Sequence, residues 1–137
     1  MGGRYLEKEE IESLLEEARI VVFCSHNKDG TIHAAPVWYR YIDGKIVVLT
    51  PGRSRKARNV KRDKNVSVLI EMRKPPKGVL FYGEAELDYS NPVSTAISIC
   101  EKYMSKEKAK SFGEGSVSSG MDLVIRVKPE RMATFHF

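Results

Sequence analysis

The sequence predicts a mainly β protein, a small antiparallel β-barrel of six or seven strands with flanking helices at its edges. Short apolar runs rich in Val and Ile recur along the chain, which is typical of buried strands. Tight turn signals such as Asp43–Gly44 separate these runs, and they favour hairpins and therefore antiparallel pairing. No linker or repeat divides the 137 residues, so a single domain over 1–137 is expected.

The first half of the chain begins with an amphipathic helix and continues as a meander of three strands. Ile11, Leu14, Leu15 and Ala18 recur at helical spacing, with Glu and Lys on the other face, and they predict a helix over 6–18. The strands that follow, separated by an NKDG turn and a DG turn, are expected at 19–26, 31–42 and 45–50. Their meander order predicts that each strand pairs antiparallel with the next.

The second half mixes helices and strands. Ser54 is a natural N-cap for a short helix that ends near Arg62. A longer helix opens at Asn91–Pro92 and carries an apolar stripe as far as Met104. The glycine- and serine-rich segment GEGSVSSG (113–120) is expected to be a flexible loop. The remaining strands are expected at 65–73, 79–88 and 121–127, with a last extended segment after Pro129.

The positive charge of the chain is concentrated in one place. The formal net charge is +5, yet Arg53–Lys64 holds seven basic residues against one acid, so the rest of the chain carries −1. A protein that coats nucleic acid usually spreads basic residues over several elements, so a single locus suits one anionic group at least as well. No apolar run approaches the length of a membrane span and the start of the chain is charged, so a cytoplasmic protein is expected.

Metal and disulfide chemistry are not expected. Cys24 and Cys100 lie far apart within apolar segments, which predicts two buried thiols. The three histidines are scattered, and no His or Cys stands at zinc-finger spacing. No catalytic triad stands out either, so the sequence assigns no catalytic acid or base.

The segment LTPGRSRKARN, at the front of the basic run, combines the features of a phosphate cradle. A strand ends at Thr50, the Pro51–Gly52 turn lets the backbone approach a ligand, and Ser54 caps the helix. Unpaired N–H groups and the positive end of the helix dipole then favour a phosphate. Arg55 and Lys56 add positive charge. The alternative is a solvated, properly capped charged helix, and the residues alone leave both interpretations open.

The strand before this segment contains an irregularity. Pro36 cannot donate a ladder hydrogen bond, so it predicts an edge or a bulge with free backbone groups nearby. A flat heterocycle could use those groups, and Ala34 and Ala35 are small enough to let it approach. Taken alone, Pro36 favours a plain edge strand that discourages aggregation.

The strand with x-x-P-V-x-Y, the hairpin, the strand-final Thr50 and the S-R-K-A-x-N segment together resemble the pyridoxamine 5'-phosphate oxidase-like, FMN-binding split-barrel family. The resemblance covers 7–137 and is sharpest over 30–71. It implies an antiparallel split barrel, a homodimer with FMN at the interface, and a flavin-dependent oxidoreductase acting on a small-molecule substrate. The cofactor-binding residues that it implies are Ala34, Ala35, Pro36, Val37, Trp38, Tyr39, Leu49, Thr50, Ser54, Arg55 and Lys56.

The chain also departs from true pyridoxamine-phosphate oxidases. It is shorter, Tyr39 stands where those enzymes tend to carry a lysine, and the end RMATFHF lacks their Arg-Leu-x-Pro and Arg-x-His sequences. Pyridoxamine phosphate is therefore not the expected substrate. Phe135 and Phe137 are candidates for contact with the partner subunit's flavin, although core packing explains both better.

Three functions remain open. The first is an FMN-dependent oxidoreductase, with a variant that uses the deazaflavin F420. The basic residues that could receive the longer anionic tail of F420 are Arg58, Lys61, Arg62 and Lys64. The second is a flavin-binding or carrier protein without turnover. The third, a nucleic-acid-binding barrel, is disfavoured because Trp38 points opposite to Tyr39 and Tyr41 on a strand, so the three form no continuous stacking platform.

Overall fold

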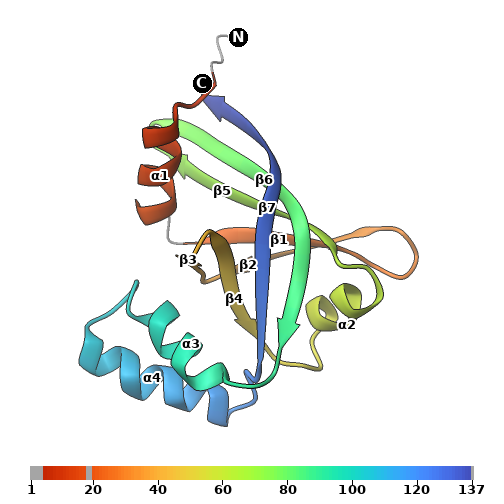
Figure 1. The fold of residues 1–137 in the computed structure, drawn as a ribbon, viewed down its shortest axis with the longest axis vertical. Coiled ribbons are helices and arrows are strands. Elements are labelled where there is room, and N and C mark those ends of the chain that lie inside the picture. Colours follow the sequence, from red (N-terminus) through yellow and green to blue (C-terminus); the bar gives the residue numbers. More distant parts are fainter. Residues whose placement is uncertain (1–4, 18–19, 137) are drawn as a thin grey trace.

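The computed structural model describes residues 5–17 and 20–136, and Figure 1 shows the helices and strands that they form. In chain order these elements are α1 (Lys8–Glu17), β1 (Val21–His26), β2 (Ile32–Val37), β3 (Arg40–Ile42), β4 (Lys45–Thr50), α2 (Arg55–Arg62), β5 (Asn65–Arg73), β6 (Pro76–Asp88), α3 (Pro92–Cys100), α4 (Lys106–Ser118) and β7 (Leu123–His136). Within the described residues, no helix is long and apolar enough to cross a membrane.

One antiparallel sheet joins the strands of the described residues in the order β2-β1-β5-β6-β7-β4-β3. The edge strands β2 and β3 stand at opposite ends of this order, although only Trp38 and Tyr39 separate them along the chain. The sheet therefore curls until its two edges meet, and Figure 1 shows β2 and β3 close together. Residues 38 and 39 connect the two edges, but among the described residues no ladder of hydrogen bonds pairs β2 with β3. The barrel is therefore open along this line, which is the definition of a split barrel. The predicted fold class, a mainly β antiparallel split barrel with flanking helices, is confirmed.

β7 holds the two halves of the sheet together. Its first residues, Leu123–Val127, pair with β4, and nearly its whole length pairs with β6. The register shifts between Tyr82 and Gly83, opposite the point where Pro129 enters the strand and cannot donate a ladder hydrogen bond. The extended segment expected after Pro129 thus continues the preceding strand to His136, and Phe137 lies outside the described residues.

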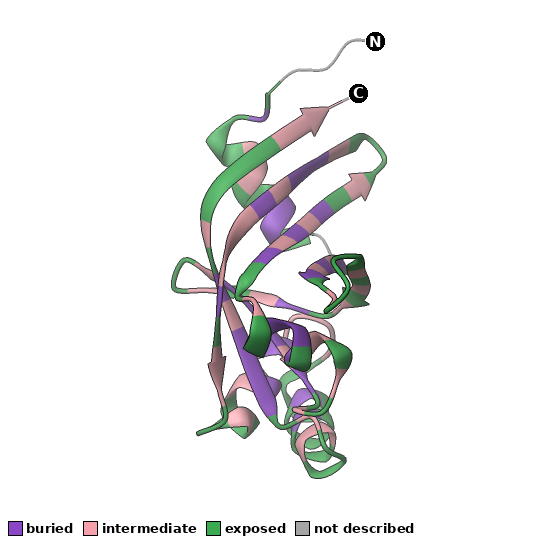
Figure 2. Ribbon diagram, turned by 90° about the vertical axis from the view of Figure 1, so that its right-hand side faces the viewer, coloured by how far each residue is buried: buried purple, intermediate pink, exposed green. Residues whose placement is uncertain are grey.

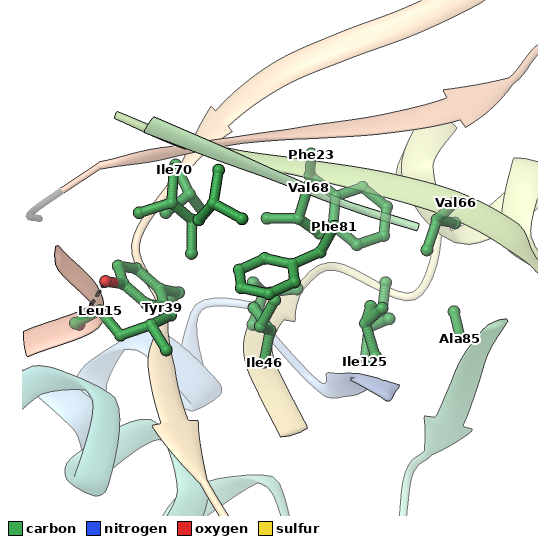
Figure 3. Close-up of a cluster of buried hydrophobic side chains, with 14 of the residues drawn as sticks. Leu15, Phe23, Tyr39, Ile46, Val66, Val68, Ile70, Phe81, Ala85 and Ile125 are labelled. Carbon is green, nitrogen blue, oxygen red and sulfur yellow. Dashed lines mark hydrogen bonds between the residues drawn. The ribbon is translucent and has the colours of Figure 1, made fainter. Parts of the chain in front are cut away.

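The core fills the inside of the curled sheet. Phe23, Val68, Phe81 and Ile125 are buried, and they come from strands β1, β5, β6 and β7 (Figure 3). Figure 2 shows buried positions alternating with more exposed ones along the strands, as expected for side chains that point to opposite faces. Helix α1 contacts β5 and β6, and Leu14 and Leu15 extend this core.

Two helix predictions agree with the structure. Helix α2 begins after its N-cap Ser54 and ends at Arg62. Helix α1 lies within the predicted span 6–18, of which Ala18 is outside the described residues. The strand expected at 19–26 begins at Val21, and Arg19 is likewise outside the described residues.

Two other predictions are wrong. The segment 113–120 is not a flexible loop, because α4 continues through most of it to Ser118. Gly113 is used there for close helix packing: a Cβ atom at Gly113 would lie 2.8 Å from the Ile97 backbone nitrogen in α3. The strand expected at 31–42 is also interrupted. β2 ends at Val37 and β3 begins at Arg40, because the chain crosses from one edge of the sheet to the other between them.

Candidate functional site

A cavity of about 300 Å³ opens between the split edge of the barrel and the α3–α4 helix pair. The end of β2, the end of β4 and the start of α2 form one side of it, and the two helices form the other. The residues that line it are Pro36, Val37, Trp38, Leu49, Thr50, Pro51, Lys56, Ala96, Ile99, Cys100, Phe112, Ser116 and Met121. Its volume is at the lower end of the range for small-molecule pockets, and its lining is mostly apolar.

The start of α2 adjoins this cavity and has features that favour an anion. Thr50 Oγ1 donates a hydrogen bond to Ser54 Oγ over 2.9 Å, and Ser54 Oγ accepts one from the Ala57 N–H over 3.1 Å. The N–H groups of Arg55 and Lys56 precede Ala57 in the first turn, where a helix offers no carbonyl acceptor. These donors and the positive end of the helix dipole therefore favour an anion at this point.

The Pro51–Gly52 turn that leads into α2 is held by the protein itself. The Gly52 N–H donates to Asp122 Oδ1 over 2.8 Å, just ahead of β7. A Cβ atom at Gly52 would lie 3.2 Å from both Asp122 Oδ1 and the Tyr89 ring. The shape of the turn is therefore set before any ligand binds, which lowers the cost of ordering it on binding.

Lys56 supplies a positive charge that is partly removed from water. Its side chain is half-buried and lines the cavity, and burial lowers the pKa of its ammonium group. Burial disfavours the charged form, and an anion beside it would offset that penalty. Lys56 is the only charged residue among the described residues that line this cavity. Arg55, in contrast, is exposed at the start of the same helix.

The structure brings together most of the cofactor-binding residues predicted from the sequence. The predicted residues that line the cavity are Pro36, Val37, Trp38, Leu49, Thr50 and Lys56. Ser54 and Arg55 lie beside it at the start of α2. Ala34 and Ala35 lie further back on β2, opposite Cys24 and Phe23 of β1, and they are not among the lining residues.

Tyr39 lies elsewhere, with its side chain fully buried in the core (Figure 3). Its hydroxyl donates a hydrogen bond to the Leu15 carbonyl over 2.5 Å, and the Lys102 ammonium lies 4.0 Å from the centre of its ring. Burial, with smaller contributions from Tyr103 and Glu16, raises the pKa of this phenol well above its usual range. The Tyr39 side chain therefore does not contribute to the cavity, and it cannot stack on a nucleic acid base.

An aromatic wall, defined here as Trp38, Tyr103 and Phe112, stands at the cavity. The Trp38 and Tyr103 rings stack with centroids 4.4 Å apart and planes 17° apart, and Trp38 and Phe112 stack at 5.8 Å and 29°. Sequence reasoning missed this wall. Tyr103 lies in the apolar stripe that was predicted to run as far as Met104. Phe112 was not recognised as a pocket residue, because the helix that contains it was not predicted.

The later residues of the basic run face other protein groups. Arg62 donates to the His26 carbonyl over 2.5 Å, and Lys64 forms an ion pair with Glu84 at 3.0 Å. The Lys61 ammonium lies 5.5 Å from the centre of the Tyr89 ring, and Arg58 is exposed. The front of the run therefore adjoins the cavity, while Arg62 and Lys64 serve the surface structure.

A second cavity, of about 550 Å³, lies on the face of the sheet opposite the core. Its lining includes Cys24, Ile32, Leu80 and Tyr82, and the Arg131 guanidinium lies 4.9 Å from the centre of the Tyr82 ring. Cys24 is half-buried, and burial raises the pKa of its thiol. Cys100 is buried at the first cavity, where the pKa of its thiol is raised in the same way, so both thiols stay protonated near neutral pH.

The sequence pattern of the family described as pyridoxamine 5'-phosphate oxidase matches residues 7–136. The chain belongs to this family. The match covers nearly the whole chain, so it includes both sides of the cavity and the start of α2. No curated protein matches the sequence.

Solved structures of the same fold extend this comparison. The chain is 26% identical to the conserved hypothetical protein Rv2991 from Mycobacterium tuberculosis, with a TM-score of 0.82 over 96% of this chain and 85% of that one. It resembles an F420 reductase (17% identity, TM-score 0.74, covering 93% and 98% of the two chains). It also resembles an FAD-binding protein from Mesorhizobium loti, at 19% identity and a TM-score of 0.73 over 100% of this chain and 99% of that one.

The same fold also occurs in HutZ, a haem storage protein from Vibrio cholerae, at 15% identity and a TM-score of 0.72 over 93% of this chain and 94% of that one. Proteins of this fold are therefore named for different molecules: F420, FAD and haem. Function must be argued from the residues of the site in each chain.

Proposed function

We propose that this protein is a flavin-dependent oxidoreductase that binds FMN at the cavity beside α2. The observation that carries the proposal is the continuity of two features: an anion site at the start of α2, and an apolar cavity that shares Thr50 and Lys56 with it. A molecule with a phosphate at one end and a flat ring system at the other matches this combination. The family match and the names of two structural relatives, an F420 reductase and an FAD-binding protein, support a cofactor of the flavin type.

The residues of the chain fit such a cofactor. The first-turn N–H groups, the Ser54 cap and the charges of Arg55 and Lys56 would hold the phosphate. Pro36, Val37 and Leu49 would face the ribityl chain and one face of the ring, because they line the cavity next to Thr50. When bound, the flavin ring supplies the redox chemistry, so the protein has only to bind, orient and shield it. No side chain is assigned as a catalytic acid or base.

A homodimer is part of the proposal, with the cofactor at the interface. The face of the sheet opposite the core exposes apolar residues along one edge strand: Ile32 is 57% exposed, and Ala34 and Pro36 beside it are exposed as well. These residues lie on β2, the strand that also lines the cofactor cavity. A second copy packed on this face would reach the open side of the site.

The dimer is tested by sedimentation of a Leu80→Glu variant, because Leu80 lines the second cavity on this face. We expect the wild type to sediment as a dimer and the variant as a monomer. Val93→Glu is the control, since Val93 is an exposed apolar residue on α3 and is not part of that cavity. A wild-type protein that sediments as a monomer contradicts this part of the proposal.

The cofactor is tested by absorption spectra of the purified protein after addition of FMN and removal of the excess. A Ser54→Ala, Arg55→Ala, Lys56→Ala variant should lose the retained flavin band. The matched control is Ser105→Ala, Lys106→Ala, Lys108→Ala, which also removes a capping serine and two basic residues, but from the first turns of α4. A protein that retains no flavin, or one whose two triple variants behave alike, contradicts the proposal.

F420 in place of FMN is the second candidate, and one observation favours it. Arg58 is exposed and Lys61 lies at the surface over Tyr89, so both can meet an anionic tail longer than one phosphate. Loading the protein with F420 and with FMN in parallel distinguishes the two candidates. The double variant Arg58→Ala, Lys61→Ala should bind F420 less tightly than the wild type does, while its affinity for FMN should not change. A protein that holds either cofactor but shows no substrate-dependent turnover would be a flavin carrier, the non-catalytic alternative.

A further inference from the structure

We propose that the exposed ring of Phe112, at the end of the Tyr103–Trp38–Phe112 stack, binds a flat, uncharged aromatic ring of the substrate. This inference rests on the proposed function, because the ring would lie in the same cavity as the flavin. It deepens that function by naming the chemical class of the substrate, and it concerns binding alone.

The geometry of the aromatic wall is that of a preformed stacking surface. Its three rings come from three different segments: the crossing between β2 and β3, the turn after α3, and α4. The centroid separation of Trp38 and Tyr103 lies at the short limit of favourable aromatic contacts, and that of Trp38 and Phe112 lies well within them. Trp38 is the ring common to both pairs, so it lies between Tyr103 and Phe112 in the stack. The Tyr103 hydroxyl accepts a hydrogen bond from the Tyr39 N–H over 2.9 Å, which fixes the Tyr103 end of the stack relative to the barrel. The wall is therefore ordered without a ligand.

The wall is nevertheless open to solvent. Trp38 is 39% exposed and Phe112 is 53% exposed, and both line the cavity. The helix side of the cavity adds Ala96, Ile99 and Met121, which offer apolar contact and no charge. A flat aromatic ring would continue the existing stack at Phe112 and remove the exposed part of that ring from water.

Other ligand chemistries fit less well. Among the described residues that line the cavity, Lys56 is the only one that could pair with a negatively charged substrate, and the proposed cofactor phosphate already uses its ammonium group. A branched aliphatic body would fill the volume but could not stack on the Phe112 ring and extend the aromatic stack. The remaining aromatic candidate is the flavin ring itself, so the test must separate cofactor from substrate.

The experiment uses isothermal titration calorimetry on the FMN-loaded protein with 1-naphthamide as the flat, uncharged probe. Its saturated counterpart, decahydronaphthalene-1-carboxamide, carries the same amide on a ring system that is not flat. We expect saturable binding of 1-naphthamide and at least about 10-fold weaker binding of the saturated compound. Phe112→Ala should lower the affinity for 1-naphthamide by about 3- to 10-fold, the range that one aromatic stacking contact gives.

Two further variants isolate the ring. Phe112→Tyr keeps an aromatic face and should bind 1-naphthamide as the wild type does. Glu114→Ala changes an exposed residue of the same helix that does not line the cavity, and it should have no effect. FMN affinity, measured separately by quenching of flavin fluorescence, should be the same in all of these proteins.

Each adverse result has its own meaning. Equal binding of the flat and saturated probes, or no effect of Phe112→Ala, overturns the stacking site. Competition between FMN and 1-naphthamide overturns it as well, because the wall would then hold the cofactor ring. Binding of 1-naphthamide to a protein that never takes up FMN overturns the proposed cofactor, while it supports the aromatic site.

Discussion

Thr50 and Ser54 share a hydrogen bond, from Thr50 Oγ1 to Ser54 Oγ over 2.9 Å, at the point where β4 turns into α2. The same serine oxygen accepts the Ala57 N–H, so it both caps the helix and ties it to the strand. We expect Ser54→Ala to lower the free energy of unfolding by about 1 kcal/mol, the usual cost of removing a helix cap, as measured by urea titration.

Ser105→Ala is the matched control for that change. Ser105 Oγ caps α4 by accepting the Lys108 N–H over 3.3 Å, and it lies outside the segment Thr50–Lys56 that is proposed to hold the phosphate. Both variants should lose stability to a similar degree, but only Ser54→Ala should also lose FMN affinity. Equal FMN affinities in the two variants would place the phosphate somewhere other than the start of α2.

The pKa of Lys56 should report the arrival of an anion. Burial lowers the pKa of this ammonium in the free protein, and a bound phosphate stabilises the charged form and raises the pKa again. We therefore expect the Lys56 pKa, followed by NMR of labelled lysine side chains, to rise when FMN is added. By linkage, FMN should bind less tightly as the pH rises through the Lys56 pKa of the bound form. An unchanged pKa would mean that Lys56 does not meet the phosphate.

Two glycines of α4 should respond to alanine in opposite directions. A Cβ atom at Gly113 would lie 2.8 Å from Ile97 backbone and side-chain atoms, so Gly113→Ala must push α3 and α4 apart. We expect it to lower the free energy of unfolding by about 1 to 3 kcal/mol. A Cβ atom at Gly115 meets nothing within 4 Å, and Gly115→Ala should stabilise the protein by up to about 1 kcal/mol. Circular dichroism during thermal unfolding checks both signs.

Tyr39 should give the protein a specific sensitivity to alkali. Burial raises its pKa above the ordinary tyrosine value, so the unfolded chain loses this proton first as the pH rises. Its contribution to stability is complete below about pH 10, the unfolded value, and is lost progressively above it. We expect the urea midpoint to fall between pH 8 and pH 11 by more in the wild type than in Tyr39→Phe. Equal decreases would show that Tyr39 ionises as freely in the folded protein as in the unfolded chain.

The parts of the fold that the sequence predicted are those with local signals. The cap at Ser54 and the β-branched runs of the strands depend on neighbours in the chain, and these elements lie where they were expected. The interruption at Trp38–Tyr39 depends on the closure of the whole sheet, which no short stretch of sequence encodes. Helix α4 was missed because glycine usually indicates a turn. In the structure, Gly113 instead lies inside the helix, where its lack of a side chain allows close packing against Ile97.

In the candidate site too, the part with a local sequence signal was predicted and the part assembled from distant residues was not. The proposed phosphate cradle is contiguous from Thr50 to Lys56, so its motif could be recognised as a unit. The opposite side of the cavity is assembled from residues such as Trp38, Ile99 and Phe112, which are far apart in sequence. Tyr39 was included among the cofactor residues through the family resemblance, whose strand motif ends at this residue. The Tyr39 side chain instead lies in the buried core, whereas that of Trp38 lines the cavity.

Trp38 is the only tryptophan in the chain, and it stands in the wall of the cavity. The indole emission of the whole protein therefore originates at one position, beside the place where a cofactor and a substrate are proposed to bind. A flavin absorbs at the wavelengths where indole emits, so its arrival would be seen as energy transfer from Trp38 without any attached label. The molecule thus carries a built-in optical probe of its own occupancy.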